Sequence, residues 1–122
     1  MSTELNHTIV WSGDREAAAG FLAGILGLPV GSPAGPFLPV RLGNNVTLDY
    51  ADAGGEVRSQ HYAFLVSDGE FDAAFGRIQA AGLAYWADPG HQQPGTINHR
   101  QGGRGVYFDD PSGHHLELLT RA

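Results

Sequence analysis

The chain has 122 residues, of which 42% are hydrophobic and 16% charged, with seven basic residues against 13 acidic ones and a net charge of −6. This length and hydrophobicity predict one domain, spanning 1–122, and exclude a disordered chain. The absence of cysteine excludes disulfides, thiolate catalysis and cysteine-ligated metal.

The distribution of charged and apolar residues also bears on whether the chain binds nucleic acid, a membrane or a metal. All seven basic residues are arginines, and they are scattered, so we expect no nucleic-acid binding. No apolar run approaches the ~20 residues of a membrane span, and the polar start MSTELNH does not resemble a signal peptide. We therefore expect a cytoplasmic protein. Six histidines beside many carboxylates still allow a metal site with nitrogen and oxygen ligands.

The first half of the chain predicts a strand, a helix and a hairpin. β-branched and aromatic residues favour a strand over 6–11, and Asp14 is expected to cap a helix that opens at Arg15 and stops at Gly27. The apolar stripe of this helix has a spacing near 3.6 residues and consists of Phe21, Leu22, Ile25, Leu26 and Leu28. Two strands are expected over 37–42 and 46–50, joined by a turn at 43–45.

After a connector at 52–56, the second half repeats this order. A strand is predicted over 61–66, Asp68 as a cap, an amphipathic helix over 71–81 and a stop at Gly82. Further strands are predicted over 83–86, 105–109 and 115–120, with a turn at 111–113 between the last two. The polar loop 88–103 either covers a site or is exposed surface.

Matched spacings indicate that the two halves are duplicates. His61 follows His7 by 54 residues, and Asp68 follows Asp14 by the same number. Gly82 follows Gly27 by 55 residues. The predicted fold class is therefore α+β, with two β-α-β-β-β modules at about 1–54 and 55–122, and the family resemblance given below implies that their curved half-barrel sheets enclose a metal cleft.

Three residues stand out as candidate metal ligands. His7 and His61 begin equivalent strands, and duplicated strands tend to approach each other around a pseudo-twofold axis. Strand alternation turns Glu117 away from its apolar neighbours, either to solvent or into a polar cavity. Each residue alone is more typical of a surface, but two imidazoles with one carboxylate are typical of non-haem Fe(II) oxygenases and also suit Mn or Zn.

The strings LNHTIV, QHYAFLV and RGVYFDDPSGHHLELL resemble the vicinal oxygen chelate superfamily, which includes glyoxalases, extradiol dioxygenases, fosfomycin-resistance transferases and bleomycin-binding proteins. The resemblance implies that His7, His61 and Glu117 bind a divalent metal, namely Fe²⁺, Mn²⁺, Zn²⁺ or Ni²⁺. The remaining ligand position of the family falls on Thr47 or Asp49, which share one strand face. Thr47 there leaves three ligands, whereas Asp49 supplies a fourth or is a pocket carboxylate.

Further residues are candidates for the substrate pocket or for catalysis. Tyr107 is expected to donate a hydrogen bond or a proton to a metal-bound substrate. His91 and His99 lie in the polar loop, either as an acid or base over the site or exposed to solvent. The remaining candidates are Arg104 as a clamp for an anionic substrate or an exposed residue, Trp11 and Trp86 as stacking surfaces, and His115 as a pocket group.

The resemblance implies a metal-dependent enzyme acting on a small substrate that chelates the metal through vicinal oxygens. A three-ligand set favours extradiol-type oxygenation first and glyoxalase (lyase) chemistry second, and the lack of lysine disfavours fosfomycin transfer. The alternative is a bleomycin-resistance-type protein that sequesters an antibiotic or another aromatic molecule without turnover. Superfamily members of this size usually dimerise, so we expect a homodimer whose two chains share the site.

Overall fold

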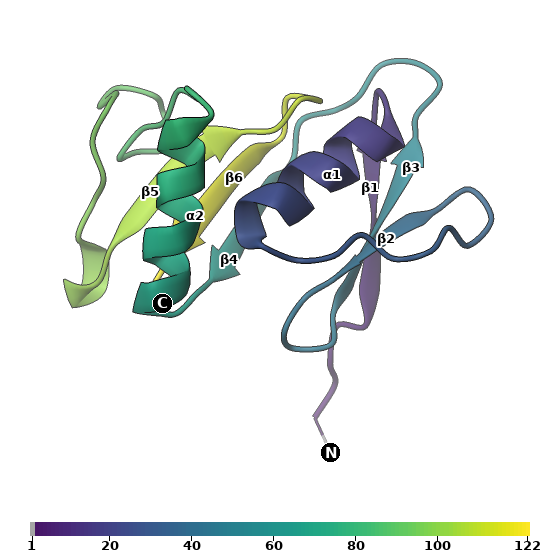
Figure 1. Cartoon of the computed structure of the whole chain (residues 1–122), viewed down its shortest axis with the longest axis horizontal. Coiled ribbons are helices and arrows are strands. Elements are labelled where there is room, and N and C mark those ends of the chain that lie inside the picture. Colours follow the sequence, from purple (N-terminus) through teal and green to yellow (C-terminus); the bar gives the residue numbers. More distant parts are fainter. Residues whose placement is uncertain (1) are drawn as a thin grey trace. The chain divides into compact units, whose positions relative to one another are not determined.

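The computed structural model describes residues 2–122, which form two compact units that divide between Arg58 and Ser59 (Figure 1). The first unit contains β1 (His7–Ser12), α1 (Arg15–Leu26), β2 (Leu38–Arg41) and β3 (Thr47–Asp52). The second contains β4 (His61–Leu65), α2 (Asp68–Ala80), the 3₁₀ turn η1 (Arg100–Gly102), β5 (Gly105–Asp109) and β6 (His115–Leu119). Within 2–122, no helix has the length and hydrophobicity needed to span a bilayer.

The two units have the same topology. The strand orders are β1-β3-β2 and β4-β6-β5, with the first and last strands of each unit parallel and the last two antiparallel. Both helices end at a left-handed glycine, Gly27 (φ 71°) and Gly82 (φ 68°). In each case the following leucine amide bonds back to the last turn, from Leu28 to Ala23 and from Leu83 to Ile78. These matched features confirm the predicted duplication.

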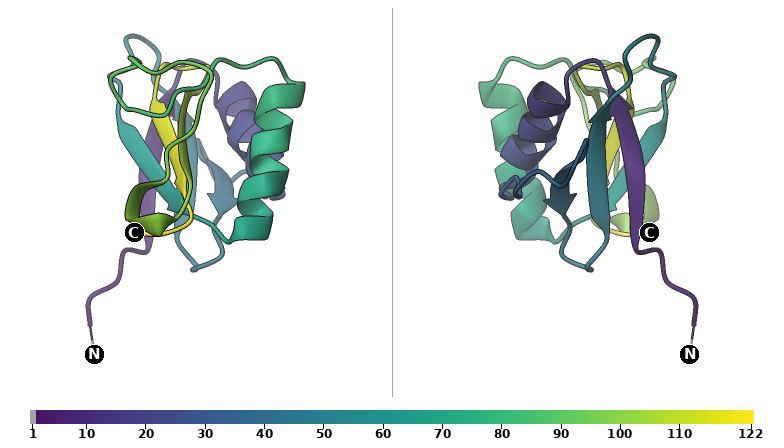
Figure 2. Two further views of the ribbon diagram at one scale, coloured as in Figure 1. Left: turned by 90° about the vertical axis from the view of Figure 1, so that its left-hand side faces the viewer. Right: turned by 90° about the vertical axis from the view of Figure 1, so that its right-hand side faces the viewer.

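Each sheet is covered by its own helix on one face, as the side-on views show (Figure 2). In the first unit α1 packs on the sheet through Leu22 and Ile25, and in the second α2 buries Phe71 and Ile78. The strand residues that point to the helices are buried, whereas those that alternate with them are mostly exposed or half-buried. Each unit therefore has an apolar core on one side of its sheet and an open face on the other.

Two details of the second unit differ from the sequence prediction. The N-cap of α2 is Ser67 and not Asp68: the Ser67 hydroxyl accepts from the Glu70 amide, and the Glu70 carboxylate accepts from the Ser67 amide. The pattern Ser-x-x-Glu is a capping box, which satisfies two free amides, and the helix begins at Asp68, three residues before the expected Phe71.

The predicted strand 83–86 is reduced to isolated bridges at Trp86, which pairs with Tyr107 and with Pro94. The equivalent place in the first unit is also a single bridge, between Val30 and Val40. Each module therefore has a three-stranded sheet, and the place of a fourth strand is marked only by bridges at a single residue. The Trp86 amide and carbonyl both bond to Tyr107, which anchors the start of the polar loop to β5.

Candidate functional site

The open face of the second sheet carries a dense group of polar side chains. Cα pairing aligns His61 on β4 with His115 on β6, and His115 with Asp109 on β5. One step further along, Glu117 pairs with Tyr107. Because residues two apart on a strand share a face, all five side chains lie on the side of the sheet opposite the core.

The central contact on this face joins His61 and Glu117. Nε2 of His61 lies 3.0 Å from Oε1 of Glu117, while Nδ1 of His61 lies 3.1 Å from the main-chain oxygen of His115. A carbonyl oxygen can only accept, so the contact with His115 is a hydrogen bond when the ring carries a proton on Nδ1, and Nε2 is the nitrogen turned to the carboxylate.

The donor set of this pair fits a divalent metal. A neutral imidazole with a protonated Nδ1 presents a lone pair at Nε2, and two electron pairs facing each other at 3.0 Å call for a proton or a cation between them. Two ligands about 2.1 Å from one ion and at right angles are about 3.0 Å apart. His61 and Glu117 therefore have both the chemistry and the spacing of neighbouring metal ligands.

Tyr107 and Arg100 extend this contact into a chain of hydrogen bonds. Nη1 of Arg100 donates to the phenol oxygen of Tyr107 over 2.7 Å, and the phenol in turn bonds to the Glu117 carboxylate. Burial raises the pKa of Tyr107, Arg100 partly offsets this, and the negative charge of Glu117 adds to it. The phenol is thus a protonated donor at neutral pH, and it orients the carboxylate that faces His61.

The β5–β6 turn holds this face in place. The buried Asp110 carboxylate accepts from the amides of Ser112 and His114, which closes the predicted turn. The ring of the fully buried His114 accepts at Nδ1 from the amide of Gln60, the residue before His61. A buried histidine therefore holds the start of β4 beside β6 and so fixes the backbone position of His61.

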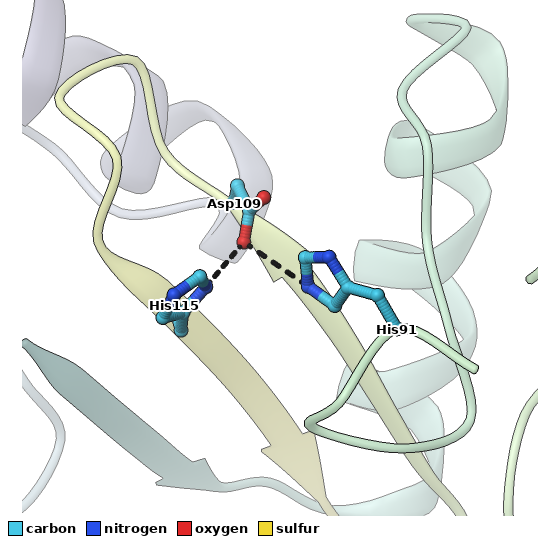
Figure 3. Close-up of side chains that lie close together, drawn as sticks. All are labelled: His91, Asp109 and His115. Carbon is cyan, nitrogen blue, oxygen red and sulfur yellow. Dashed lines mark hydrogen bonds and ion pairs between the residues drawn. The ribbon is translucent and has the colours of Figure 1, made fainter. Parts of the chain in front are cut away.

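A second cluster lies at the other end of the same face (Figure 3). His91, Asp109 and His115 each offer one ligand atom, and these atoms lie within 4.8 Å of one another, the one such group of three found in the part of the chain that the structure describes. Oδ1 of Asp109 is 2.8 Å from Nδ1 of His115 and 3.6 Å from Nε2 of His91.

The polar loop that carries His91 is folded against the sheet. The His91 ring stacks flat on Trp86, with ring centroids 3.6 Å apart and planes 2° apart. Burial alone raises the pKa of the Asp88 carboxyl, but the amides of Gln92 and Gln93 donate to it and hold the pKa below its ordinary value. The loop is therefore organised by its own turn and not loosely exposed.

A small cavity of about 200 Å³ opens beside Glu117. It is lined by Asn98, Arg100, Gln101, Arg104, Glu117, Leu119, Arg121 and Ala122. Three of the seven arginines of an otherwise acidic chain are thus gathered next to one end of the open face.

The first unit presents an equivalent open face with His7, Thr47 and Asp49. His7 pairs with Thr47 as His61 pairs with His115, so Thr47 corresponds to His115 and Asp49 corresponds to Glu117. In this register the Asp49 carboxylate, and not the Thr47 hydroxyl, takes the place in the first unit that Glu117 has in the second. Nδ1 of His7 lies 2.8 Å from Oδ1 of the neighbouring Asn6.

The other expected pocket residues lie in varied surroundings. Trp11 is 51% exposed on the open face of the first unit. Arg104 lines the cavity, but its guanidinium is paired with Asp68 and Asp72 of α2, at 3.3 and 2.6 Å. His99 is exposed at the residue before η1.

Two residues of the site escape the sequence analysis. Arg100 bonds to Tyr107 from a 3₁₀ turn with an irregular backbone, and no local pattern marks it. Asp109 was also missed, although the sequence holds a signal for it: it shares a strand face with Tyr107 and lies two residues before the predicted turn at 111–113.

Comparison with known proteins places this geometry among related folds. The family model described as Glyoxalase/Bleomycin resistance protein/Dioxygenase superfamily matches residues 4–118. Two solved structures, Oxidase ChaP-H2 and Oxidase ChaP-H1, are each 60% identical to the chain, with TM-scores of 0.98 and 0.97. They cover 100% and 99% of this chain, which covers 96% and 98% of theirs. Glutathione transferase FosA from Serratia marcescens is 29% identical over 124 residues, 97% of this chain and 81% of that protein.

Proposed function

The chain belongs to the glyoxalase, bleomycin resistance protein and dioxygenase superfamily, and from this premise we propose that it is a metal-dependent oxidase acting on a small substrate that binds the metal through two neighbouring oxygens. The observation that carries the proposal is the convergence of Nε2 of His61 and Oε1 of Glu117 at 3.0 Å. The 60% identity to two proteins named oxidases favours oxidation over the other reactions of the superfamily.

His61 and Glu117 would hold the metal together with His7, the third ligand implied by the family resemblance. Asp49 would join as a fourth ligand, because it occupies the place in the first unit that Glu117 occupies in the second. We propose a homodimer in which His7 of one protomer meets His61 and Glu117 of its partner. Imidazole and carboxylate ligands suit Fe²⁺, Mn²⁺, Zn²⁺ and Ni²⁺ alike, and oxidation by O₂ favours Fe²⁺.

A bound divalent metal supplies a Lewis acid and a template for the substrate oxygens, and Fe²⁺ adds a reductant for O₂. The chain supplies the orientation of the ligands. Tyr107 holds the Glu117 carboxylate with a proton that its raised pKa retains, and Arg100 fixes the phenol from the other side. His115 fixes the His61 ring through its main-chain oxygen, so that Nε2 and not Nδ1 faces the metal position.

The cavity beside Glu117 favours a substrate with negative charge. Arg104 is neutralised by Asp68 and Asp72, but Arg121 adds a further guanidinium to the lining without a carboxylate neighbour among the ion pairs of residues 2–122. A phenolate or carboxylate group of the substrate would complement it. We therefore propose that the substrate carries a negatively charged oxygen group.

Sequestration without turnover is the second candidate, and the exposed Trp11 favours it. An indole that is 51% exposed on an open sheet face offers a stacking surface for an aromatic drug. The 29% identity to Glutathione transferase FosA makes fosfomycin a compound to include in the same test.

Metal analysis of three proteins tests the proposal. Purified wild type is expected to bind one equivalent of Fe²⁺ at this site, and Glu117→Gln, which keeps the shape and removes the charge, is expected to lose at least about tenfold in affinity. Asp49→Asn is the matched variant at the equivalent position, and a similar loss there would identify a fourth ligand. Oxygen uptake by the Fe²⁺-loaded wild type with catechol-type substrates then separates an oxidase from a binding protein.

Two results would contradict the proposed function. Glu117→Gln with wild-type metal affinity would overturn the metal site. Tight binding of an aromatic drug by wild type without oxygen uptake for any diphenol would replace catalysis by sequestration.

A further inference from the structure

We propose that His91, Asp109 and His115 form a second divalent-cation site, separate from the metal position of His61 and Glu117. The three side chains come from three segments, namely the polar loop after Trp86, the end of β5 and the start of β6 (Figure 3). The proposed oxidase site uses the main-chain oxygen of His115 and none of these three side chains. The second site is inferred from their own geometry and does not depend on the oxidase chemistry.

The donor atoms are of the right kind and nearly at the right spacing. Two imidazole nitrogens and one carboxylate oxygen lie within 4.8 Å of one another. Tetrahedral ligands about 2.1 Å from an ion are about 3.4 Å apart, and Oδ1 of Asp109 is 3.6 Å from His91 and 2.8 Å from His115. Small side-chain movements would let all three reach one ion.

The cluster is held more firmly than surface histidines usually are. The His91 ring is fixed by its flat stack on Trp86, and His91 itself has a left-handed backbone (φ 57°), a conformation that non-glycine residues rarely adopt. The rings of His91 and His115 meet edge to face, with centroids 5.5 Å apart. Side chains that are already held in place lose little conformational entropy when they bind an ion, which favours metal binding.

The site also leaves room for further ligands. The side chains of His91, Asp109 and His115 are 30%, 37% and 48% exposed, so water or a ligand can fill the remaining coordination positions. A mixed nitrogen and oxygen set of this kind suits Zn²⁺ or Co²⁺. A bound cation would tie the polar loop to the same sheet face that carries Glu117, and the site would therefore control how the loop lies over that face.

Titration of the metal-stripped full chain with Zn²⁺ and Co²⁺ tests the proposal, because the two sites are removed by different substitutions. We expect two equivalents of Zn²⁺ per chain for wild type and one for His91→Gln or Asp109→Asn. His99→Gln is the matched control, a histidine of the same loop outside the cluster, and it should keep both equivalents. Removing one ligand should weaken the second site by at least about tenfold.

Trp86 provides a local signal. In Trp11→Phe, Trp86 is the remaining tryptophan, and Co²⁺ binding to His91 should quench its fluorescence. The quenching should survive in Trp11→Phe/Glu117→Gln and disappear in Trp11→Phe/His91→Gln. Circular dichroism spectra that match wild type would show that each variant is folded.

The outcomes separate this site from the proposed oxidase site. One equivalent of Zn²⁺ that is lost in Glu117→Gln and kept in His91→Gln, without quenching of Trp86, would overturn the second site and leave the oxidase site intact. One equivalent lost in His91→Gln and kept in Glu117→Gln would establish this site and overturn the other.

Discussion

At the scale of single residues, strand alternation predicts which face a side chain lies on but not which side chains it contacts. The apolar neighbours of Glu117 show from sequence that it points away from the core, and His61 begins the strand that becomes its parallel neighbour. Their contact at 3.0 Å depends on the register of two strands separated by about fifty residues, which no local pattern encodes. The same holds for Asp49, whose place opposite Ile9 depends on the register of β1 and β3.

Tyr107 provides a test of how the site positions its carboxylate. Tyr107→Phe removes the proton that orients Glu117 and leaves the ring in place, so Fe²⁺ affinity should fall by about 10- to 100-fold while the fold is kept. Tyr85→Phe is the control, because Tyr85 bonds only weakly, over 3.4 Å, to Gln79 of α2. Equal Fe²⁺ affinity in the two variants would show that Tyr107 has no part in holding the ligand.

At the scale of elements, unfolding experiments can test whether Ser67 and not Asp68 caps α2. Ser67→Ala removes the hydroxyl that accepts from Glu70 and should lower the free energy of unfolding by about 1 kcal/mol. Asp68→Asn leaves the capping box complete and should change stability less, through its exposed pair with Arg104 alone. Urea denaturation of both variants measures the difference, and a larger loss in Asp68→Asn would restore Asp68 as the cap.

The turn built on Asp88 predicts a pH dependence. The amides of Gln92 and Gln93 hold the pKa of Asp88 below its ordinary value of about 3.9. Its contribution to stability is therefore complete above that pH and is lost as the pH falls through the lower folded pKa. Asp88→Asn should melt below wild type at pH 7, and the gap between the two should narrow below about pH 4. A gap that stays constant down to pH 2 would contradict this.

At the scale of the whole molecule, the open faces predict association. Ile9 and Trp11 are 38% and 51% exposed on the first sheet, and Leu65 is 66% exposed on the second. A second copy of the chain would cover them, and a stable interface buries more than about 1,000 Å². Light scattering should give twice the chain mass of 12.9 kDa, and Trp11→Asp should shift the protein toward monomer. A single 12.9 kDa species for wild type would exclude the dimer.

The duplication shows what sequence can predict at this scale. Matched spacing of His7 and His61, and of Gly27 and Gly82, is enough to predict two equivalent modules, because caps and strand starts are local signals. The strand predicted at 83–86 is reduced to isolated bridges at Trp86, and the equivalent place in the first module, where no strand was predicted, is a single bridge at Val30. Loop contacts such as that of His91 with Asp109 also stay hidden, since they depend on how a long loop folds back.

The pairing of the first strand of each unit with its last has a consequence for folding. The antiparallel pairs β2–β3 and β5–β6 are local and can form early, whereas β1 and β4 must wait for partners 40 and 54 residues further along the chain. Loop closure makes the parallel pairing the late step in both units. The strands that arrive last carry His7 and His61, so under the proposed metal site a partly folded chain would have no complete ligand set, and metal capture would report on the final step of folding.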